Sequence, residues 1–218
     1  MGSCSSGGKR KTITLKPNLN KDTHPETDTD LVEYLTKTHT SSVSAETAVL
    51  RTNPNYDVSM DYKMNCQRCV WAYELQRRGY DVEALPTFKG DDLPRQGNWM
   101  NLSKNARQGN TKYVGRMYGQ TNSVKTEISN ITEAMNDWGD GSRAIVRVVW
   151  KNQNMGHVFN IENVGGVIRA FDGQTGKEIR LRDYLSKARR GYTSLVRSDN
   201  ADLDMNEISK YVKIRGGK

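Results

Sequence analysis

The stretch Asn65-Cys66-Gln67-Arg68-Cys69-Val70-Trp71-Ala72-Tyr73 begins a predicted helix with a cysteine at its first position. Asn65 is a favourable N-cap residue, and Gly79 stands where a glycine commonly ends a helix. The pattern therefore predicts a helix of about 13 residues from Cys66 to Arg78. Its apolar residues recur at spacings of three and four, which predicts one buried face.

The two cysteines of this stretch differ in their backbone amides. The positive end of a helix lowers the pKa of a thiol, so either cysteine is a candidate nucleophile. Cys66 is the first helical residue, and its N–H has no partner inside the helix and can bind a developing oxyanion. The N–H of Cys69 bonds the Asn65 carbonyl. We therefore expect Cys66 to be the nucleophile and Cys69 to be the second choice, with Asn65 as a candidate contact for oxyanion or substrate.

A second segment, about ninety residues further on, supplies a base. It reads Gly156-His157-Val158-Phe159-Asn160-Ile161, and a strand from Val167 to Phe171 then leads into Asp172-Gly173-Gln174-Thr175-Gly176. If the loop is Asn163-Val164-Gly165-Gly166, Glu162 pairs with Val167 and His157 lies opposite Asp172. Opposed residues share one face of a sheet, so the carboxylate can orient the imidazole toward the thiol.

Cys66, His157 and Asp172 together predict a thiol active site. His24 and His39 precede the predicted compact part, which leaves His157 as its histidine. Gln174 is a further candidate for binding the oxyanion or the substrate. Its residue type equally suits the turn in which it lies.

The remaining periodicities predict an α+β fold in which the cysteine-bearing helix packs on an antiparallel sheet. Further strands are expected at Tyr80–Leu85, Ala144–Trp150 and Ser194–Val196. An amphipathic helix is expected from Val124 to Gly139 and a short one from Arg182 to Ala188. Residues 87–120 are rich in Gly, Asn, Gln and Lys and are expected to be mostly loop.

The composition predicts a flexible basic N-terminal tail over residues 1–57 and one domain over residues 58–218. A short helix is expected within the tail from Leu31 to Thr36. The chain of 218 residues has a net charge of +8 and a hydrophobic content of only 35%. The basic tail could contact nucleic acid, although no nucleic-acid-binding motif accompanies the charge.

Three cysteines do not make a disulfide framework, and one Cys-x-x-Cys pair is too few ligands for a structural zinc. We expect neither a metal nor another cofactor. The sequence contains no apolar run long enough to span a membrane and no secretory signal. The chain is therefore expected to be cytoplasmic as made.

These motifs resemble the papain-like fold toxin domains of bacteria and phages, the papain-fold toxin 1 family with glutamine deamidase activity. The resemblance is carried by Asn65-Cys66-x-x-Cys69, by Gly156-His157-Val158-Phe159-Asn160 and by Phe171-Asp172-Gly173-Gln174-Thr175-Gly176. It covers about residues 57–200, and Arg197-Ser198-Asp199-Asn200 is similar to the segment that closes such domains. The resemblance implies a papain-like fold with Cys66, His157 and Asp172 as its catalytic triad. The papain pattern has a glutamine shortly before the cysteine, where this chain has Met60 and Lys63.

The resemblance implies a protein glutamine deamidase that works through a thioester. A cysteine protease and a transglutaminase share the first half of that reaction and stay open. A non-enzymatic phage virion or head protein is a second class of function, and a thiol oxidoreductase using Cys66 and Cys69 is a third. The expected partners are a protein substrate, an immunity protein or phage capsid and head proteins, with delivery to a target cell or packaging in a virion.

Overall fold

The fold is described by a computed structural model, which covers residues 29–37, 39, 41–87, 111–113 and 123–216. Most of the expected stretch of loop at 87–120 lies outside the described residues. The helices are α1 (Thr29–Thr36), α2 (Ala45–Thr52), the 3₁₀ helix η1 (Met60–Lys63), α3 (Cys66–Arg77), α4 (Val124–Trp138), α5 (Leu181–Lys187) and α6 (Met205–Ile208). The strands are β1 (Val82–Ala84), β2 (Thr111–Tyr113), β3 (Arg143–Val149), β4 (Gly156–Val164), β5 (Val167–Asp172), β6 (Lys177–Ile179), β7 (Ser194–Arg197) and β8 (Val212–Ile214).

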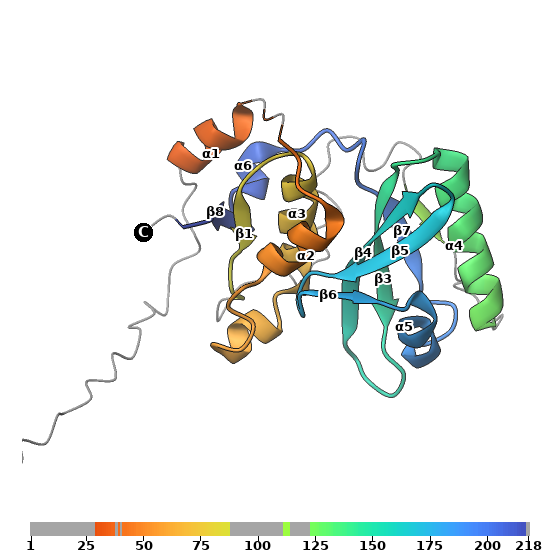
Figure 1. The fold of residues 1–218 in the computed structure, drawn as a ribbon. Helices are drawn as coiled ribbons and strands as arrows, with labels where there is room; N and C mark the ends of the chain where they lie inside the picture. The colour runs from red at the N-terminus through yellow and green to blue at the C-terminus, as the bar shows by residue number, and fades with distance from the viewer. Residues whose placement is uncertain (1–28, 38, 40, 88–110, 114–122, 217–218) are drawn as a thin grey trace, which may run out of the picture.

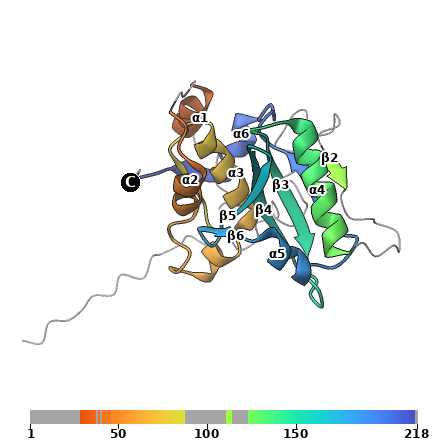
Figure 2. The same cartoon turned by 45° about the vertical axis from the view of Figure 1, so that its right-hand side comes forward.

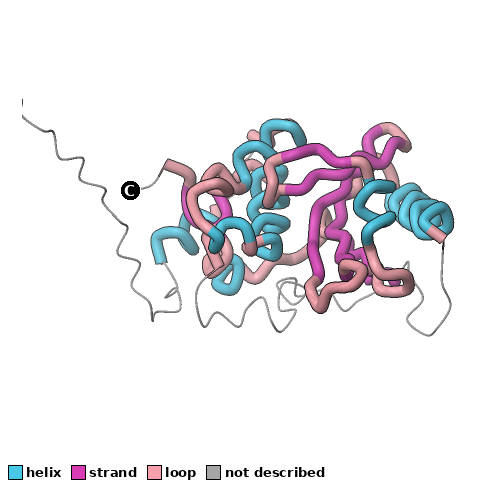
Figure 3. The backbone as a smooth tube through the Cα atoms, turned by 90° about the horizontal axis from the view of Figure 1, so that it is seen from below, coloured by secondary structure: helices cyan, strands magenta, loops and turns pink. Residues whose placement is uncertain are grey.

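A six-stranded antiparallel sheet forms the middle layer of the fold. Its strand order is β2-β7-β3-β4-β5-β6, and β1 and β8 form a separate antiparallel pair. Helices α1, α2, α3 and α6 lie on one side of the sheet, and α4 and α5 lie on the other (Figures 1 and 2). Seen from below, helices flank the strands on both sides (Figure 3). The α+β prediction, with a helix packed on an antiparallel sheet, is confirmed.

Alternation along the strands fills two separate cores. Ile145 and Val158 pack with α3, whereas Val146 and Phe159 pack under α4 and α5. Successive side chains of a strand point to opposite faces, so one pair of strands serves both layers. Nine consecutive residues of α3, Arg68 to Gln76, are buried, because the sheet covers one side of the helix and α2 and β1 cover others. The helix is thus enclosed instead of half-exposed.

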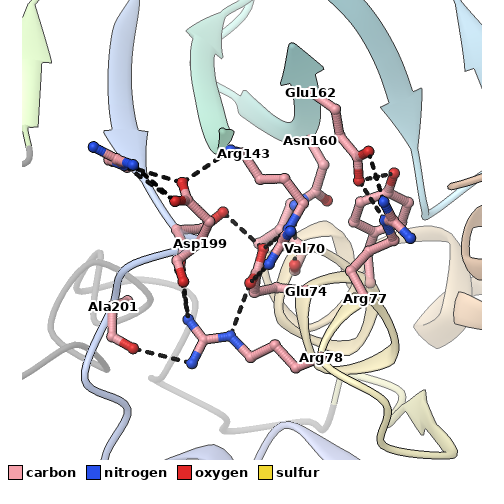
Figure 4. A network of polar contacts seen from close by, with 12 residues as sticks. Val70, Glu74, Arg77, Arg78, Arg143, Asn160, Glu162, Asp199 and Ala201 are labelled. Carbon is pink, nitrogen blue, oxygen red and sulfur yellow. Dashed lines mark hydrogen bonds and ion pairs between the residues drawn. The ribbon is translucent and has the colours of Figure 1, made fainter. Parts of the chain in front are cut away.

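The end of α3 is fixed by a buried polar network (Figure 4). The Glu74 carboxylate accepts hydrogen bonds from Arg78 at 2.8 Å, from Arg143 at 2.8 and 3.0 Å and from the Ser198 hydroxyl at 2.9 Å. Arg78 also donates to the carbonyls of Ser198 at 2.6 Å and Ala201 at 3.0 Å. The network therefore binds residues 198–201, part of the segment expected to close the domain, to α3 and β3.

The hairpin of β4 and β5 differs in register from the prediction. Val164 pairs with Val167, so the loop is the two-residue turn Gly165-Gly166 instead of four residues. Both glycines have positive φ, of 59° and 83°, as a two-residue hairpin turn of this hand requires. The predicted opposition of His157 and Asp172 is therefore wrong by two residues. Because the shift is even, both side chains stay on one face.

The described residues of the predicted tail include two helices, α1 and α2. The helix expected at Leu31–Thr36 is present as α1, with Leu31 and Leu35 buried in the core around α3. Helix α2 was not predicted. Its Val49, together with two alanines, packs against Tyr73 of α3 and Phe171 of β5. Helix α2 spans only eight residues, which is shorter than the window over which helical spacing can be recognised in a sequence.

Candidate functional site

The three residues predicted to form the site come from three elements that meet at one end of the sheet. Cys66 is the first residue of α3, His157 is the second residue of β4, and Asp172 is the last residue of β5. Strand β4 begins where β5 ends, since the two strands run antiparallel. The first turn of α3 also lies at this end. The Cys66 thiol is therefore close enough to the His157 ring to interact with it electrostatically.

The imidazole of His157 contacts the carboxylate of Asp172. Its Nε2 lies 3.2 Å from Asp172 Oδ2, and both residues are buried, with 8% and 1% of their surface exposed. Because Nε2 is turned toward Asp172, Nδ1 is the ring nitrogen left to face the thiol. Burial disfavours the charged ring, but the interactions with Asp172 and Cys66 outweigh it and raise the pKa of His157 to about 10.

Asp172 is held from two further directions. The Tyr184 hydroxyl donates to Oδ2 at 2.6 Å, and the Gln174 backbone N–H donates to Oδ1 at 3.1 Å. Burial by itself would raise the pKa of Asp172, yet the electrostatic interaction with His157 and the hydrogen bonds from Tyr184 and Gln174 lower it below its ordinary value. Burial and the nearby Asp172 charge raise the pKa of Tyr184, so its hydroxyl stays a donor at neutral pH.

Aromatic rings enclose the histidine. Trp150 stacks on the His157 ring with centroids 5.7 Å apart and an interplanar angle of 21°, and Phe159 and Tyr184 lie at 6.3 and 5.9 Å. Trp150 and Tyr184 were not identified from the sequence. Pairing β3 with β4 could have identified Trp150. Val148 pairs with His157 in that ladder, and Trp150, two residues further along, lies on the same face. No sequence pattern places Tyr184, which reaches Asp172 from α5.

The first turn of α3 has the backbone pattern expected for a nucleophile at Cys66. The Asn65 carbonyl accepts from the N–H of Arg68 at 2.8 Å and of Cys69 at 3.1 Å. Cys66, one position inside the helix, precedes the first N–H that the helix can use. Its amide can therefore serve a negatively charged oxygen formed next to its own sulfur.

Cys69 lies in a different environment. Its side chain is only 1% exposed, and its Sγ donates to Asn65 Oδ1 at 3.1 Å. Burial, followed by the nearby charges of Cys66 and Asp172, raises the pKa of the Cys69 thiol well above its ordinary value. A neutral, enclosed thiol is a poor nucleophile, so the second-choice residue fits a packing role.

Asn65 was expected to cap α3 with its side chain, but the side chain makes no capping hydrogen bond. Its Nδ2 donates to the Leu85 carbonyl at 3.0 Å and to Asn53 Oδ1 at 3.2 Å. Asn53 in turn donates to the carbonyls of Tyr62 at 2.9 Å and Gln174 at 2.8 Å. Both groups of the Asn65 amide thus have partners inside the protein, and its role toward the oxyanion or the substrate stays a prediction.

The amide of Asn53 therefore connects three segments that surround Cys66: η1, the start of α3 and the turn after β5. Gly173 in that turn allows the close approach. A Cβ added there would lie 2.7 Å from Thr52 Cγ2 and 3.5 Å from Cys69 Cβ. Gln174 is 9% exposed, and the contacts described for it are those of its backbone, so its predicted role toward substrate stays a prediction.

A cavity of about 620 Å³ adjoins the site. Trp150 and Tyr184, which contact His157 and Asp172, form part of its wall, together with Lys151, Gln153, Ser186 and Lys187. Among the residues that the structure describes, no group of three or more His, Cys, Asp and Glu side chains is placed to hold a metal ion. None of the helices in the described ranges is long and apolar enough to cross a bilayer.

Comparison with known proteins gives a family. The model of the family described as papain fold toxin 1, glutamine deamidase, matches residues 64–177, which contain Cys66, His157 and Asp172. Searches of curated proteins and of solved structures returned no match. The family match spans more than half of the chain, so this chain belongs to the papain fold toxin 1, glutamine deamidase family.

Proposed function

We propose that this family member is a cysteine-dependent protein glutamine deamidase with Cys66 as nucleophile, His157 as proton carrier and Asp172 as the group that orients His157. The observation that carries the proposal is the position of the His157 ring, which interacts with the Asp172 carboxylate through Nε2 and with the Cys66 thiol. The family assignment supports the carboxamide of glutamine as the group attacked.

The reaction begins when Cys66 transfers its proton to His157, whose raised pKa favours accepting it. The thiolate then attacks the side-chain carbonyl carbon of a glutamine, and the Cys66 N–H binds the oxygen that becomes negative. His157 gives its proton to the departing nitrogen, so ammonia leaves and a thioester remains on Cys66.

Hydrolysis completes the cycle. A water molecule loses a proton to His157 and attacks the thioester, and the proton then returns to the Cys66 sulfur as it departs. The net change converts one carboxamide and one water into one carboxylic acid and one ammonia. Asp172 keeps the ring oriented throughout, and Tyr184 and the Gln174 amide keep Asp172 in place.

The test is to incubate cell lysate proteins with the full chain and measure their masses. Deamidation adds about 1 Da at particular glutamines, because an amide becomes an acid through the thioester. We expect Cys66→Ser to abolish these changes and Cys69→Ser, a matched substitution one helical turn away, to retain them. New chain termini in place of mass changes at glutamine would indicate a protease. Changes that persist in Cys66→Ser would overturn the proposal.

The substrate is accordingly proposed to be a protein, and delivery to a target cell is consistent with a toxin family. An immunity protein and phage head proteins as partners stay predictions from the resemblance.

A further inference from the structure

The cavity beside the site is built from the loop between β3 and β4 and from α5, which lie next to each other at the lower edge of Figure 1. Two contacts hold them together. The Lys151 N–H donates to the Lys187 carbonyl at 3.0 Å, and Lys151 Nζ donates to the Ser186 carbonyl at 2.7 Å. The cavity thus has a defined wall of backbone and long polar side chains.

A smaller hollow of about 310 Å³ continues from the first. It shares Trp150, Lys151 and Gln153 with the larger cavity and adds Asn152, Asn154 and Arg189. Pockets of a few hundred Å³ hold small ligands or a few side chains of a bound chain. Trp150 contributes to both hollows and stacks on His157, so a ligand that fills them contacts a ring that itself packs against the catalytic histidine.

The charge of this surface has one sign. Lys151, Lys187 and Arg189 line the two hollows, and among the described residues no carboxylate lines either one. Across the described part of the chain these three cations make no ion pair. Lys151 acts at a distance on the buried Glu127, but that carboxylate is already bonded to Arg190 at 3.1 Å. Arg189 lies over the Tyr192 ring at 4.3 Å.

Three cations around one concave surface, with no ion pair to another described side chain, repel each other, and an anion bound among them relieves that repulsion. Lysine and arginine side chains donate to carboxylates through charge-assisted hydrogen bonds, and the amides of Gln153, Asn152 and Asn154 provide further donors. The ligand must also fit beside a site that acts on a polypeptide, so the matching anions are aspartate and glutamate side chains.

We propose that Lys151, Lys187 and Arg189 form a subsite that binds acidic side chains flanking the reactive glutamine of the protein substrate. The proposal rests on the proposed function, because it takes the bound chain to be the one that presents its glutamine to Cys66. It assigns a substrate class, namely glutamines in acidic segments. Complementary charge of this kind acts mainly on selectivity and on the rate of association.

The experiment measures binding apart from catalysis, using the full chain with Cys66→Ser and fluorescence anisotropy. Three short labelled peptides carry one central glutamine flanked by glutamates, serines or lysines. We expect the glutamate peptide to bind most tightly and its binding to weaken with salt. Combined Lys187→Glu and Arg189→Glu should weaken its binding by about tenfold, since each exposed ion pair contributes up to about 1 kcal/mol and tenfold corresponds to 1.4 kcal/mol.

The matched control is Lys37→Glu, the same reversal on an exposed lysine of the N-terminal part, which should change nothing. Equal binding of the three peptides, or unchanged binding in the double variant, would overturn the subsite. Tighter binding of a single-stranded oligonucleotide through Lys187 and Arg189 would assign the surface to nucleic acid instead. Charge-dependent peptide binding without any deamidation by the wild type would leave the subsite standing and overturn the proposed function.

Discussion

Replacing Asp172 with asparagine tests the electrostatics of the site directly. The pKa of His157 is raised from 6.5 to about 10, a difference of between three and four pKa units. Each unit corresponds to about 1.36 kcal/mol, so the charged ring is favoured by about 5 kcal/mol over one in water. Asp172 supplies part of this, because a single opposite charge at such range shifts a pKa by about 1–3 units.

We therefore expect Asp172→Asn to lower the pKa of His157 by about 1–3 units. Asparagine has nearly the same shape and can still contact the ring, so the change removes charge more than geometry. The measurement is an NMR titration of ¹⁵N-labelled imidazoles in the full chain, with the His157 resonances identified by their loss in His157→Gln. Asp183→Asn is the matched control, since this more exposed carboxylate of α5 pairs with Arg180 and should leave the titration unchanged.

The same shift sets the pH dependence of stability. Because the folded-state pKa of His157 lies above its unfolded value, its stabilisation is complete below about pH 6.5 and is lost as pH rises through about 10. The free energy of unfolding in urea should fall over this range in the wild type and fall less in Asp172→Asn. A wild-type His157 that titrates near 6.5, or a pKa that does not move in Asp172→Asn, would refute the reasoning.

Two further substitutions test the packing that supports the site. Glu74→Ala leaves Arg78 and Arg143 without their buried carboxylate, and we expect it to lower the free energy of unfolding by about 3–5 kcal/mol, measured by urea denaturation. Gly173→Ala places a methyl group 2.7 Å from Thr52 Cγ2 and should cost about 1–3 kcal/mol in the same assay, whereas adding Thr52→Ser removes that methyl contact and should restore part of the loss.

Each substitution has an internal comparison. Glu33→Ala removes an exposed partner of Lys37 and should change stability by less than about 1 kcal/mol. A loss in Glu74→Ala no larger than this would contradict the role given to the buried network. Equal destabilisation of Gly173→Ala with and without Thr52→Ser would show that the cost does not come from the close approach.

Local patterns sufficed to predict the elements that carry the site. Asn65 and Gly79 bracket α3 within one residue, and the four central strands and α5 lie where alternation and spacing placed them. The hairpin register was wrong because a four-residue and a two-residue loop both end at Gly166. The shared face survived, since the two registers differ by an even number of residues.

The parts of the site that the sequence did not predict depend on contacts between residues far apart in the chain. Tyr184 bonds Asp172 only because α5 folds back over the end of the sheet, and no spacing rule links the two. Asn53 donates hydrogen bonds to Tyr62, Asn65 and Gln174, and Gln174 is 121 positions away in the sequence. In the sequence Asn53 reads as an ordinary polar residue of the predicted N-terminal tail.

The position of Asn53 bears on how the chain can be shortened for study. A fragment trimmed to the family match would begin at residue 64 and lose α2 together with Asn53. The Gln174 carbonyl would then lose its bond from Asn53, at a cost of about 1–3 kcal/mol for a buried group left unsatisfied. The Asn65 Nδ2 would keep its bond to the Leu85 carbonyl and lose the one to Asn53. Truncations that retain residues from Ser44 onward keep the hydrogen bonds of Asn53. Truncations that remove Asn53 should lower the stability of the start of α3, which carries Cys66.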